Sequence, residues 1–469
     1  MTTQEEQTRA GLRFPAGFTL GAATSAYQIE GAVDEDGRGT SIWDTFAKTP
    51  GRVLNGHNAD VAIDHYHRYR DDVALMADLG LTAYRFSVSW PRIQPTGSGK
   101  VNQKGLDFYK RLTDELRGHG IDPWLTLYHW DLPQELEDKG GWPNRDVAYC
   151  FADYAATVHE ALKDHVHTFS TVNEPWCAAF LGYASGEHAP GRREPQNAIR
   201  GAHHLNLAHG LAVQAMGARR VGGCVNLYAV DPATDSVEDL DAARRIDGLQ
   251  NRFFLDALLL GRYPEDVLDD LPVEIDFIQP GDMKTINAPI DLLLVNYYSR
   301  FTVSGAPGGK QSASAAPTDT GSPWVGSEHV SFVSAGHPVT AMGWEIDESG
   351  LVEVLTRVAR EYPAIPMVVS ENGAAFDDEL VDGRIHDRER QGYVEAHLGA
   401  CKEAIDRGVP LEGYFAWSLM DNFEWAWGYG KRFGLVHVDF ETQERRLKDS
   451  ALWYSEIIRQ NSQHEPTDS

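Results

Sequence analysis

Cysteine is scarce in this sequence of 469 residues, and its spacing argues against both disulfide bonds and metal binding. The chain has four cysteines and no Cys-x-x-Cys pair: Cys150, Cys177, Cys224 and Cys401. Disulfide-stabilised domains and structural zinc sites use several closely spaced cysteines. We therefore expect reduced thiols, and a core built from the apolar residues that make up 42% of the sequence.

Long hydrophobic runs are also missing. The most apolar short segments, 258–260 and 292–295, fall far below the roughly 20 residues that a membrane-spanning helix needs. Residues 1–13 are polar and lack the apolar segment of a secretory signal. We therefore expect no membrane partner and a cytoplasmic location.

Basic residues are outnumbered by acidic ones. Lysine and arginine total 42 and aspartate and glutamate total 69, which gives a net charge of −27 at pH 7. Such a field repels nucleic acid, so we expect no nucleic-acid partner. A Gly-x-Gly-x-x-Gly turn and a Gly-Lys-Ser/Thr loop are both absent. The histidine pairs 65/67 and 203/204 lack metal-ligand spacing, so we predict no cofactor and no metal.

The sequence alternates strand-like and helix-like segments from end to end. Short apolar or β-branched runs predict strands at 19–23, 83–87, 123–127, 168–172, 221–226, 292–296, 367–370 and 413–417. Amphipathic periodicity predicts helices at 59–79, 103–119, 146–164, 194–218, 239–260, 348–361, 387–407 and 448–460. Eight strand–helix units predict a closed α/β fold, the (β/α)8 or TIM barrel, with long βα loops on its catalytic face.

The domain prediction is a single barrel over residues 1–469. Residues 304–334 are rich in Ser, Ala, Gly and Pro and lack periodicity, which indicates a long, mobile loop after the sixth strand. This segment is too short to be a domain. We expect residues 1–13 and 461–469 to be flexible ends.

Polar and aromatic residues gather where the predicted strands end. Because sugar hydroxyls each need a hydrogen-bond partner and indoles stack on sugar rings, this ring predicts a polyhydroxylated ligand. Its members include Gln28, Arg85, His129, Trp130, Asn173, Glu174, Asn226, Asn296, Tyr298, Glu371, Trp417, Glu424 and Trp425.

Two of these residues, Glu174 and Glu371, are the carboxylates that cleavage of a glycosidic bond requires. One must protonate the leaving oxygen, and burial or a neighbouring negative charge would keep Glu174 protonated for this task. The other must stay ionised, and Arg85 is the natural counter-ion of Glu371, with Tyr298 as a hydrogen-bond donor. This division predicts the retaining geometry, with the carboxyls about 5–5.5 Å apart.

Eight segments in order make the chain resemble a glycoside hydrolase family 1 β-glucosidase over nearly its full length. They are 18–31 (FTLGAATSAYQIEG), 84–92 (YRFSVSWPR), 127–133 (LYHWDLP), 171–175 (TVNEP), 188–191 (HAPG), 296–298 (NYY), 370–373 (SENG) and 413–429 (GYFAWSLMDNFEWAWGY). One departure is Ser370, where the family usually has threonine. Both carry a hydroxyl, so the implied catalysis is unaffected.

The resemblance implies a role for each site residue. Glu174 is implied as the general acid/base and Glu371 as the nucleophile. The hydroxyls of the terminal sugar are implied to bind Gln28, His129, Asn173 and Glu424. Trp417 and Trp425 are implied to line the sugar subsite, and Trp344 to contact the leaving group. We add Arg85, Tyr298 and Asn296 to the catalytic set, and Trp130 and Asn226 to the substrate-binding set.

These observations predict a retaining, exo-acting β-glucosidase that acts on short β-glucosides and cello-oligosaccharides. Three alternatives stay open: a β-galactosidase or β-fucosidase, a 6-phospho-β-glucosidase, and a non-catalytic sugar-binding relative. The phosphate-specific relatives carry a small residue such as serine where this chain has Glu424. The sequence leaves open the natural aglycone, the transglycosylation ratio, the temperature optimum, the glucose tolerance and the oligomeric state, including a homo-oligomer.

Overall fold

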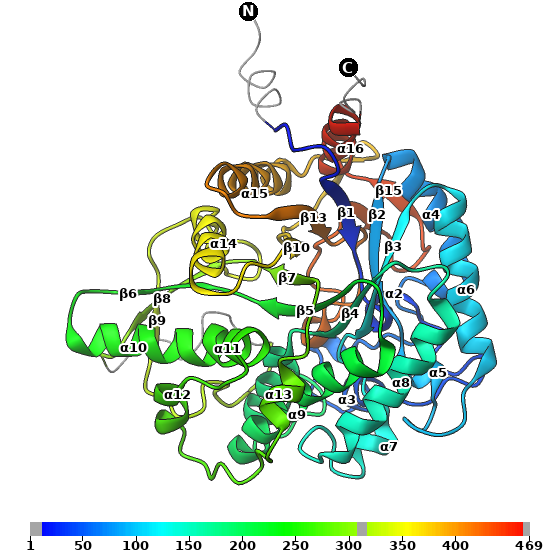
Figure 1. Ribbon diagram of the computed structural model, residues 1–469. Helices are drawn as coiled ribbons and strands as arrows, with labels where there is room; N and C mark the ends of the chain where they lie inside the picture. The colour runs from blue at the N-terminus through cyan, green and yellow to red at the C-terminus, as the bar shows by residue number, and fades with distance from the viewer. Residues whose placement is uncertain (1–11, 307–316, 463–469) are drawn as a thin grey trace, which may run out of the picture.

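The computed structural model describes residues 12–306 and 317–462 and contains the predicted closed barrel of eight parallel strands (Figure 1). The hydrogen-bonded order around the barrel is β1-β13-β10-β7-β5-β4-β3-β2. The strands are β1 (Thr19–Ala23), β2 (Ala83–Ser87), β3 (Asp122–Tyr128), β4 (Thr168–Asn173), β5 (Val221–Asn226), β7 (Leu292–Asn296), β10 (Met367–Asn372) and β13 (Leu411–Trp417). All eight predicted strands are confirmed, within two residues at each end.

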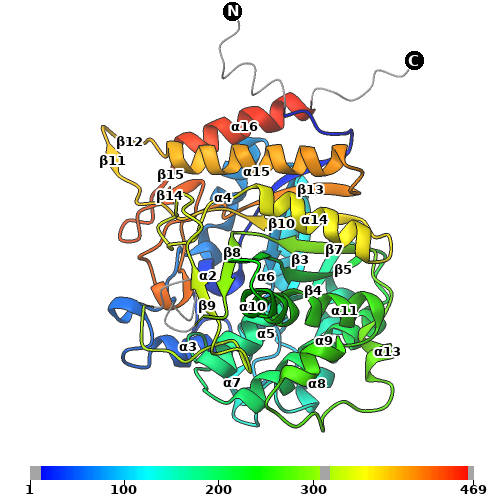
Figure 2. The same cartoon turned by 90° about the vertical axis from the view of Figure 1, so that its left-hand side faces the viewer.

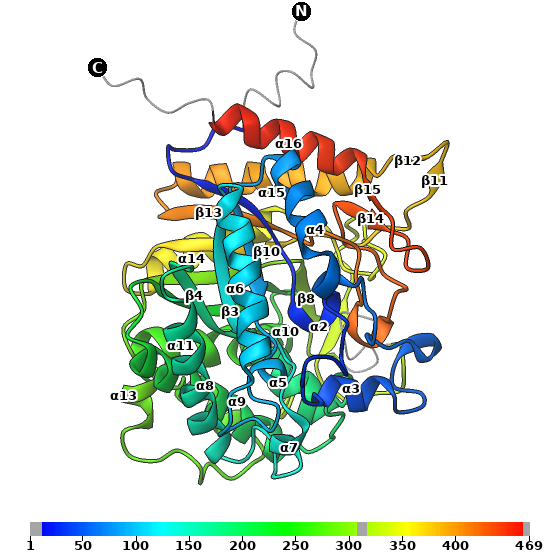
Figure 3. The ribbon, with the colours of Figure 1, turned by 90° about the vertical axis from the view of Figure 1, so that its right-hand side faces the viewer.

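Helices cover the outside of the barrel, and α4 and α6 lie side by side on one flank (Figure 3). The larger helices are α4 (His65–Leu79), α6 (Gln103–Gly118), α8 (Asp146–Leu162), α9 (Pro195–Met216), α10 (Val237–Asp247), α11 (Phe253–Leu260), α14 (Ser349–Glu361), α15 (Arg388–Asp406) and α16 (Asp449–Ser462). Within residues 12–306 and 317–462, every helix is too short or too polar to cross a membrane.

One helix prediction was wrong in its extent, and another missed an interruption. The helix predicted at 59–79 begins only at His65, because Ala62 and Asp64 adopt left-handed backbone angles that a helix cannot contain. The helix predicted at 239–260 is divided into α10 and α11 by a π-helical turn, η3 (Gly248–Arg252). Periodicity alone does not detect such a turn, because it inserts a residue without breaking the helical hydrogen bonding.

Short elements build the loops and the remaining connections. They are α2 (Ala26–Ile29), α3 (Ile42–Ala47), η1 (Leu54–Gly56), α5 (Trp90–Ile93), α7 (Gln134–Glu137), η2 (Cys177–Ser185), β6 (Ala229–Pro232), α12 (Glu265–Asp270), α13 (Asp282–Ile286), β8 (Arg300–Ser304), β9 (Ser331–Val333), β11 (Leu380–Val381), β12 (Arg384–Ile385), η4 (Trp425–Trp427), β14 (Val436–Val438) and β15 (Arg445–Leu447). The β11–β12 hairpin projects from the body of the molecule (Figure 2).

The segment predicted to be an irregular loop, 304–334, contains regular structure at both ends. It starts at the last residue of β8 and includes β9, which pairs antiparallel with β8 in a small sheet completed by β6. Trp324, which lies between β8 and β9 in the sequence, is 3% exposed. Residues 307–316 of this segment lie outside the described residues.

The two ends of the described chain pack against each other. Residues 12–13 and 461–462, which we predicted to be part of the flexible ends, therefore form part of the fold. Leu12 is buried, and its carbonyl accepts a hydrogen bond from Asn461 Nδ2 at 3.0 Å. Asn461 belongs to α16 and also accepts from the backbone N–H of Phe14. The remaining residues of those two predicted segments, 1–11 and 463–469, lie outside the described residues.

Large side chains fill the interior of the barrel and close it below the site. The rings of Trp124 and Phe415 meet there with centroids 5.0 Å apart. Phe415 requires a glycine at position 21, because a Cβ on Gly21 would lie 2.7 Å from the phenylalanine ring. The barrel is therefore a packed support rather than a channel, and the strand ends above it can hold fixed positions.

Candidate active site

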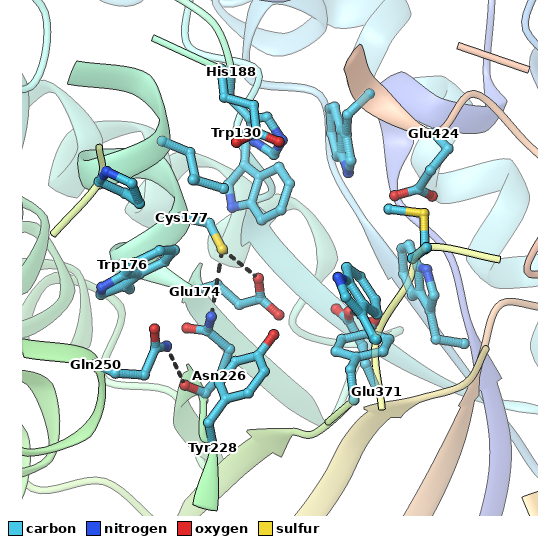
Figure 4. A pocket seen from close by; sticks show the side chains of 18 of the residues that line it. Trp130, Glu174, Trp176, Cys177, His188, Asn226, Tyr228, Gln250, Glu371 and Glu424 are labelled. Carbon is cyan, nitrogen blue, oxygen red and sulfur yellow. Dashed lines mark hydrogen bonds between the residues drawn. The ribbon is translucent and has the colours of Figure 1, made fainter. Parts of the chain in front are cut away.

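Two glutamates, Glu174 and Glu371, line one cavity at the carboxyl-terminal end of the barrel (Figure 4). Glu174 directly follows β4, and Glu371 lies on β10. The pairing register shifts just before each of them, between Ser170 and Asn173 and between Val369 and Glu371. Such an irregularity adds a residue to one strand and redirects the side chain that follows. We attribute the orientation of both glutamates to these two bulges.

Glu371 is held by a charged donor and a phenol. Arg85 Nη1 donates to Glu371 Oε1 at 2.5 Å, and Tyr298 Oη donates to Oε2 at 2.7 Å. Arg85 comes from β2, and its side chain is 1% exposed. Charge-assisted hydrogen bonds of this kind are about twice as strong as neutral ones. Both oxygens of Glu371 therefore have partners that favour the ionised form.

Glu174 has neutral partners only. Asn296 Nδ2 donates to Glu174 Oε1 at 2.7 Å, and the Cys177 thiol donates to Oε2 at 3.1 Å. The backbone of Glu174 is in the left-handed region, with φ 46°, and its N–H donates to the carbonyl of Cys224. A non-glycine residue adopts this conformation at a cost that the surrounding structure must offset.

The two carboxyls differ in how firmly they hold a proton. Burial, and then the charge of Glu371, raise the pKa of Glu174 to about 8. Burial also raises the pKa of Glu371, but the Arg85 charge and hydrogen bonds from Tyr298, Arg85 and Asn296 all lower it. At neutral pH the pair therefore holds one proton, and that proton belongs on Glu174.

Two asparagines and a histidine connect the two carboxyls. Asn173 Oδ1 accepts from Arg85 Nη2 at 2.7 Å and from Asn296 Nδ2 at 3.2 Å. Burial, and then the Arg85 charge, hold the pKa of His129 well below its usual range, so the ring is neutral. Its Nε2 lies 3.3 Å from Asn173 Nδ2, and its buried Nδ1 has no partner among the described residues. The free ring nitrogen can serve a ligand hydroxyl.

A third carboxyl, Glu424, faces the pair from the loop after β13. Gln28 Nε2 fixes this loop by donating to Asn422 Oδ1 and to the carbonyl of Phe423, each at 2.9 Å. Burial, and then the charges of the other two glutamates, raise the pKa of Glu424 to about 8. Glu424 is thus a protonated, hydrogen-bonding side chain at neutral pH.

Indoles form much of the cavity wall. His129 stacks on Trp417 with ring centroids 5.7 Å apart, and Trp130 contacts Trp425 at 4.6 Å. Trp130 and Trp425, like Glu174, have positive φ, at 79° and 47°, so backbone strain is present at this cavity. Seven of the twelve tryptophans of the chain line it: Trp130, Trp176, Trp324, Trp344, Trp417, Trp425 and Trp427.

The structure brings the predicted site residues together. Ten line the cavity: Glu174, Glu371, Tyr298, His129, Trp130, Asn226, Trp344, Trp417, Glu424 and Trp425. The other four hydrogen bond to lining residues: Arg85, Asn296, Asn173 and Gln28. Their roles in a reaction remain predictions at this point.

Sequence reasoning missed part of the wall. Trp176 and Cys177 follow Glu174 and lie on the cavity side, although only the Thr171–Pro175 motif attracted notice. The three-residue spacing of Cys177 from Glu174 is the signal that could have found the cysteine. Trp324 comes from the Ser- and Gly-rich segment, where nothing in the pattern marks it. Tyr228 directly precedes β6, and Gln250 lies in η3. The predicted alternation of strands and helices contains neither of these two elements.

In the described part of the chain, no group of three or more His, Cys, Asp or Glu side chains is arranged to hold a metal ion. The chemistry that the site offers is that of its carboxyls, amides, phenols and indoles.

The raised pKa of Glu174 predicts a specific pH dependence of stability. Because Glu174 is protonated in the folded state up to about pH 8 and ionises near 4.5 when unfolded, it destabilises the fold progressively as the pH rises between these values. The stability of Glu174→Gln relative to the parent protein should therefore rise over this range, by about 4 kcal/mol between pH 4 and pH 8. Urea unfolding of both proteins from pH 4 to 8 measures this. A difference that stays constant with pH would contradict the assignment of the proton.

Comparisons with known proteins agree with this architecture. The family model "Glycosyl hydrolase family 1" matches residues 11–463. The chain is 51% identical to a thermostable β-glucosidase B of Thermobispora bispora, over 96% of this chain and 91% of that protein. It is 49% identical to a bifunctional β-D-glucosidase/β-D-fucosidase of Bifidobacterium breve, over 96% and 99%. The crystal structure of a psychrophilic β-glucosidase from Micrococcus antarcticus superposes with a TM-score of 0.93, at 48% identity over 97% and 99%. The chain belongs to glycosyl hydrolase family 1.

Proposed function

We propose that this protein is a retaining, exo-acting β-glucosidase that removes terminal β-D-glucosyl residues from short β-glucosides and cello-oligosaccharides. The observation that carries the proposal is the unequal pair of carboxyls. Glu371 has a charged donor and a phenol, and Glu174 has only neutral donors. The names of the related proteins from Thermobispora bispora and Micrococcus antarcticus support the choice of glucose.

In the first step, Glu371 attacks the anomeric carbon while Glu174 gives its proton to the leaving oxygen. The Arg85 hydrogen bond keeps Glu371 ionised, and the raised pKa of Glu174 keeps it protonated at neutral pH. The bond from the anomeric carbon to the leaving oxygen breaks as the bond to Glu371 forms. Positive charge that develops on the sugar is stabilised by the carboxylate.

In the second step, Glu174 acts as a base. Having lost its proton, it accepts one from a water molecule, which attacks the anomeric carbon and releases Glu371. Two inversions give a product with the configuration of the substrate. This sequence requires the carboxyls to be about 5–5.5 Å apart, and the chain of hydrogen bonds from Glu174 through Asn296, Asn173 and Arg85 to Glu371 supports a close approach.

The remaining residues bind the sugar. We assign the hydroxyls of the terminal glucose to Gln28, His129, Asn173 and Glu424, and the stacking surface below its ring to Trp417. His129 stacks on Trp417, and Trp130 and Trp425 pack against His129 in turn. Trp344 and Asn226 lie nearer the leaving group. Trp344 packs against Tyr298, the partner of Glu371, with ring centroids 5.5 Å apart, and this contact supports its assignment to the leaving-group side.

The two roles can be separated by azide rescue. Glu371→Ala should lose at least about a thousandfold in kcat on an aryl β-glucoside, because the nucleophile is gone. Azide should then restore turnover from the vacated side and give the α-glucosyl azide. Glu174→Ala should still cleave substrates with a good leaving group, and azide should give the β-glucosyl azide. Product anomers are assigned by NMR.

Glu412→Ala is the matched control, since Glu412 is an exposed glutamate at the opposite end of β13. It should keep the activity of the parent protein. Survival of a tenth of the activity in Glu371→Ala, or interchange of the two azide products, would overturn the assignment.

A β-fucosidase activity is the second candidate, because the Bifidobacterium breve relative is named for both sugars. A 6-phospho-β-glucosidase is less well supported. None of the described residues that line the cavity is a lysine or arginine, and Lys431 Nζ instead donates to the carbonyl of Ala341 while lying over Trp427. A buried phosphate would thus lack a counter-charge.

A panel of sugars ranks these candidates. We expect aryl β-D-glucoside to have the highest kcat/KM, the β-D-fucoside and β-D-galactoside to be turned over more slowly, and cellobiose to exceed its 6-phosphate by at least about a hundredfold. Preference for the phosphate would refute glucosidase specificity. No turnover of any member would favour the non-catalytic alternative. The cytoplasmic location, a part in cellulose degradation and any self-association remain predictions from the sequence.

A further inference from the structure

Cys177 lies beside the acid/base carboxyl and takes no part in the mechanism above. It begins η2, the π-helical segment that follows β4, and stands three residues after Glu174. At this helical spacing two side chains lie on the same face. The thiol lines the cavity and is 7% exposed.

The thiol is held between two polar groups, as Figure 4 shows. Cys177 Sγ donates to Glu174 Oε2 at 3.1 Å, and Asn226 Nδ2 donates to the same sulfur at 3.5 Å. Gln250 in turn fixes Asn226 by donating to its backbone carbonyl at 3.0 Å. Burial, and then the charge of Glu174, raise the pKa of the Cys177 thiol well above its usual range. The thiol therefore stays protonated over the pH range in which the enzyme is active.

The two oxygens of Glu174 are not equivalent as proton carriers. Oε1 accepts an N–H from Asn296, and an amide N–H cannot accept a proton in return. The acidic proton therefore resides on Oε2, next to the thiol. A thiol is both a weak donor and a weak acceptor, and its S–H bond can rotate. It can donate to the carboxylate and, after rotation, accept from the carboxylic acid.

We propose that Cys177 is a positioning residue that keeps the exchangeable proton of Glu174 on Oε2 and holds it weakly enough for transfer to the leaving group. This inference rests on the proposed function. A side chain that forms a stronger hydrogen bond at this position would either hold the proton of the carboxylic acid too tightly or stabilise the carboxylate so much that Glu174 would lose its proton too early. An apolar side chain would leave Oε2 without its donor after the proton has left.

Several other groups act on Glu174 and must stay unchanged in a test. The charges and titratable side chains around Glu174 and Cys177 come from β2, β5 and β10 and from the segments that follow β5, β7, η2 and β13. They are Arg85, Cys224, Tyr298, Glu371, Glu187, Tyr228 and Glu424. Substitutions at Cys177 alter none of these side chains directly.

The test compares Cys177→Val, which removes the donor at similar volume, with Cys177→Ser, which supplies a stronger one. The basic limb of kcat/KM against pH reports the general acid of the free enzyme. Because a hydrogen bond to a carboxylate lowers its pKa, the limb should move up by about 0.5 pH unit in Cys177→Val and down by a similar amount in Cys177→Ser. Cys401→Val, at a buried thiol on α15, is the matched control and should leave the limb in place.

Two results would overturn the proposal: limbs that stay in place in both Cys177 variants, or limbs that move in the same direction. A readout without turnover is the S–H stretching band of Cys177 in infrared spectra, assigned by its loss in Cys177→Val. This band should shift as the pH is carried through the pKa of Glu174, and a fixed band would count against the proposal. If the parent protein did not cleave aryl β-glucosides at all, the proposed function would fail instead, while the infrared test of the thiol contact would still stand.

Discussion

The hydrogen bond between Arg85 and Glu371 is the interaction on which the rest of the site depends. It places a positive charge against one of two buried carboxyls that share a cavity, and both carboxyls would otherwise resist ionisation because of burial. Because Arg85 contacts Glu371 and not Glu174, the ionised form is favoured at Glu371. That charge then raises the pKa of Glu174 further. One arginine therefore creates both a nucleophile and an acid from two identical side chains.

The barrel makes this arrangement possible by bringing distant segments together with little freedom to move. Arg85, Glu174, Asn296 and Glu371 come from four strand ends, and packed rings below them fill the barrel interior. We attribute the orientation of the two glutamates to bulges in β4 and β10, and left-handed backbone at Glu174, Trp130 and Trp425 adds strain at the same rim. The strained backbone of the site lowers the stability of the fold, and the rigid strands hold it in place despite this.

Much of this could be predicted from the sequence, because the signals are local. Each barrel strand is a short apolar run, and polar residues at its end mark the site directly. What failed was set by tertiary structure. The start of α4 depends on left-handed backbone at Ala62 and Asp64, and the break between α10 and α11 is a π turn that leaves the apolar pattern intact. Trp324 reaches the cavity from a segment whose composition indicates only a loop, and the contact of Cys177 with Glu174 depends on side-chain geometry.

The division of one proton between two glutamates can be observed without any substrate. Infrared difference spectra at pH 6.5 compare the protein with Glu174→Gln and with Glu371→Gln. We expect Glu174→Gln to lose the C=O stretching band of a protonated carboxyl and to keep the carboxylate band of Glu371. Because the charge of Glu371 raises the pKa of Glu174, Glu371→Gln should lower the pH at which the protonated band disappears. Loss of a carboxylate band in Glu174→Gln, with the protonated band unchanged, would contradict the account.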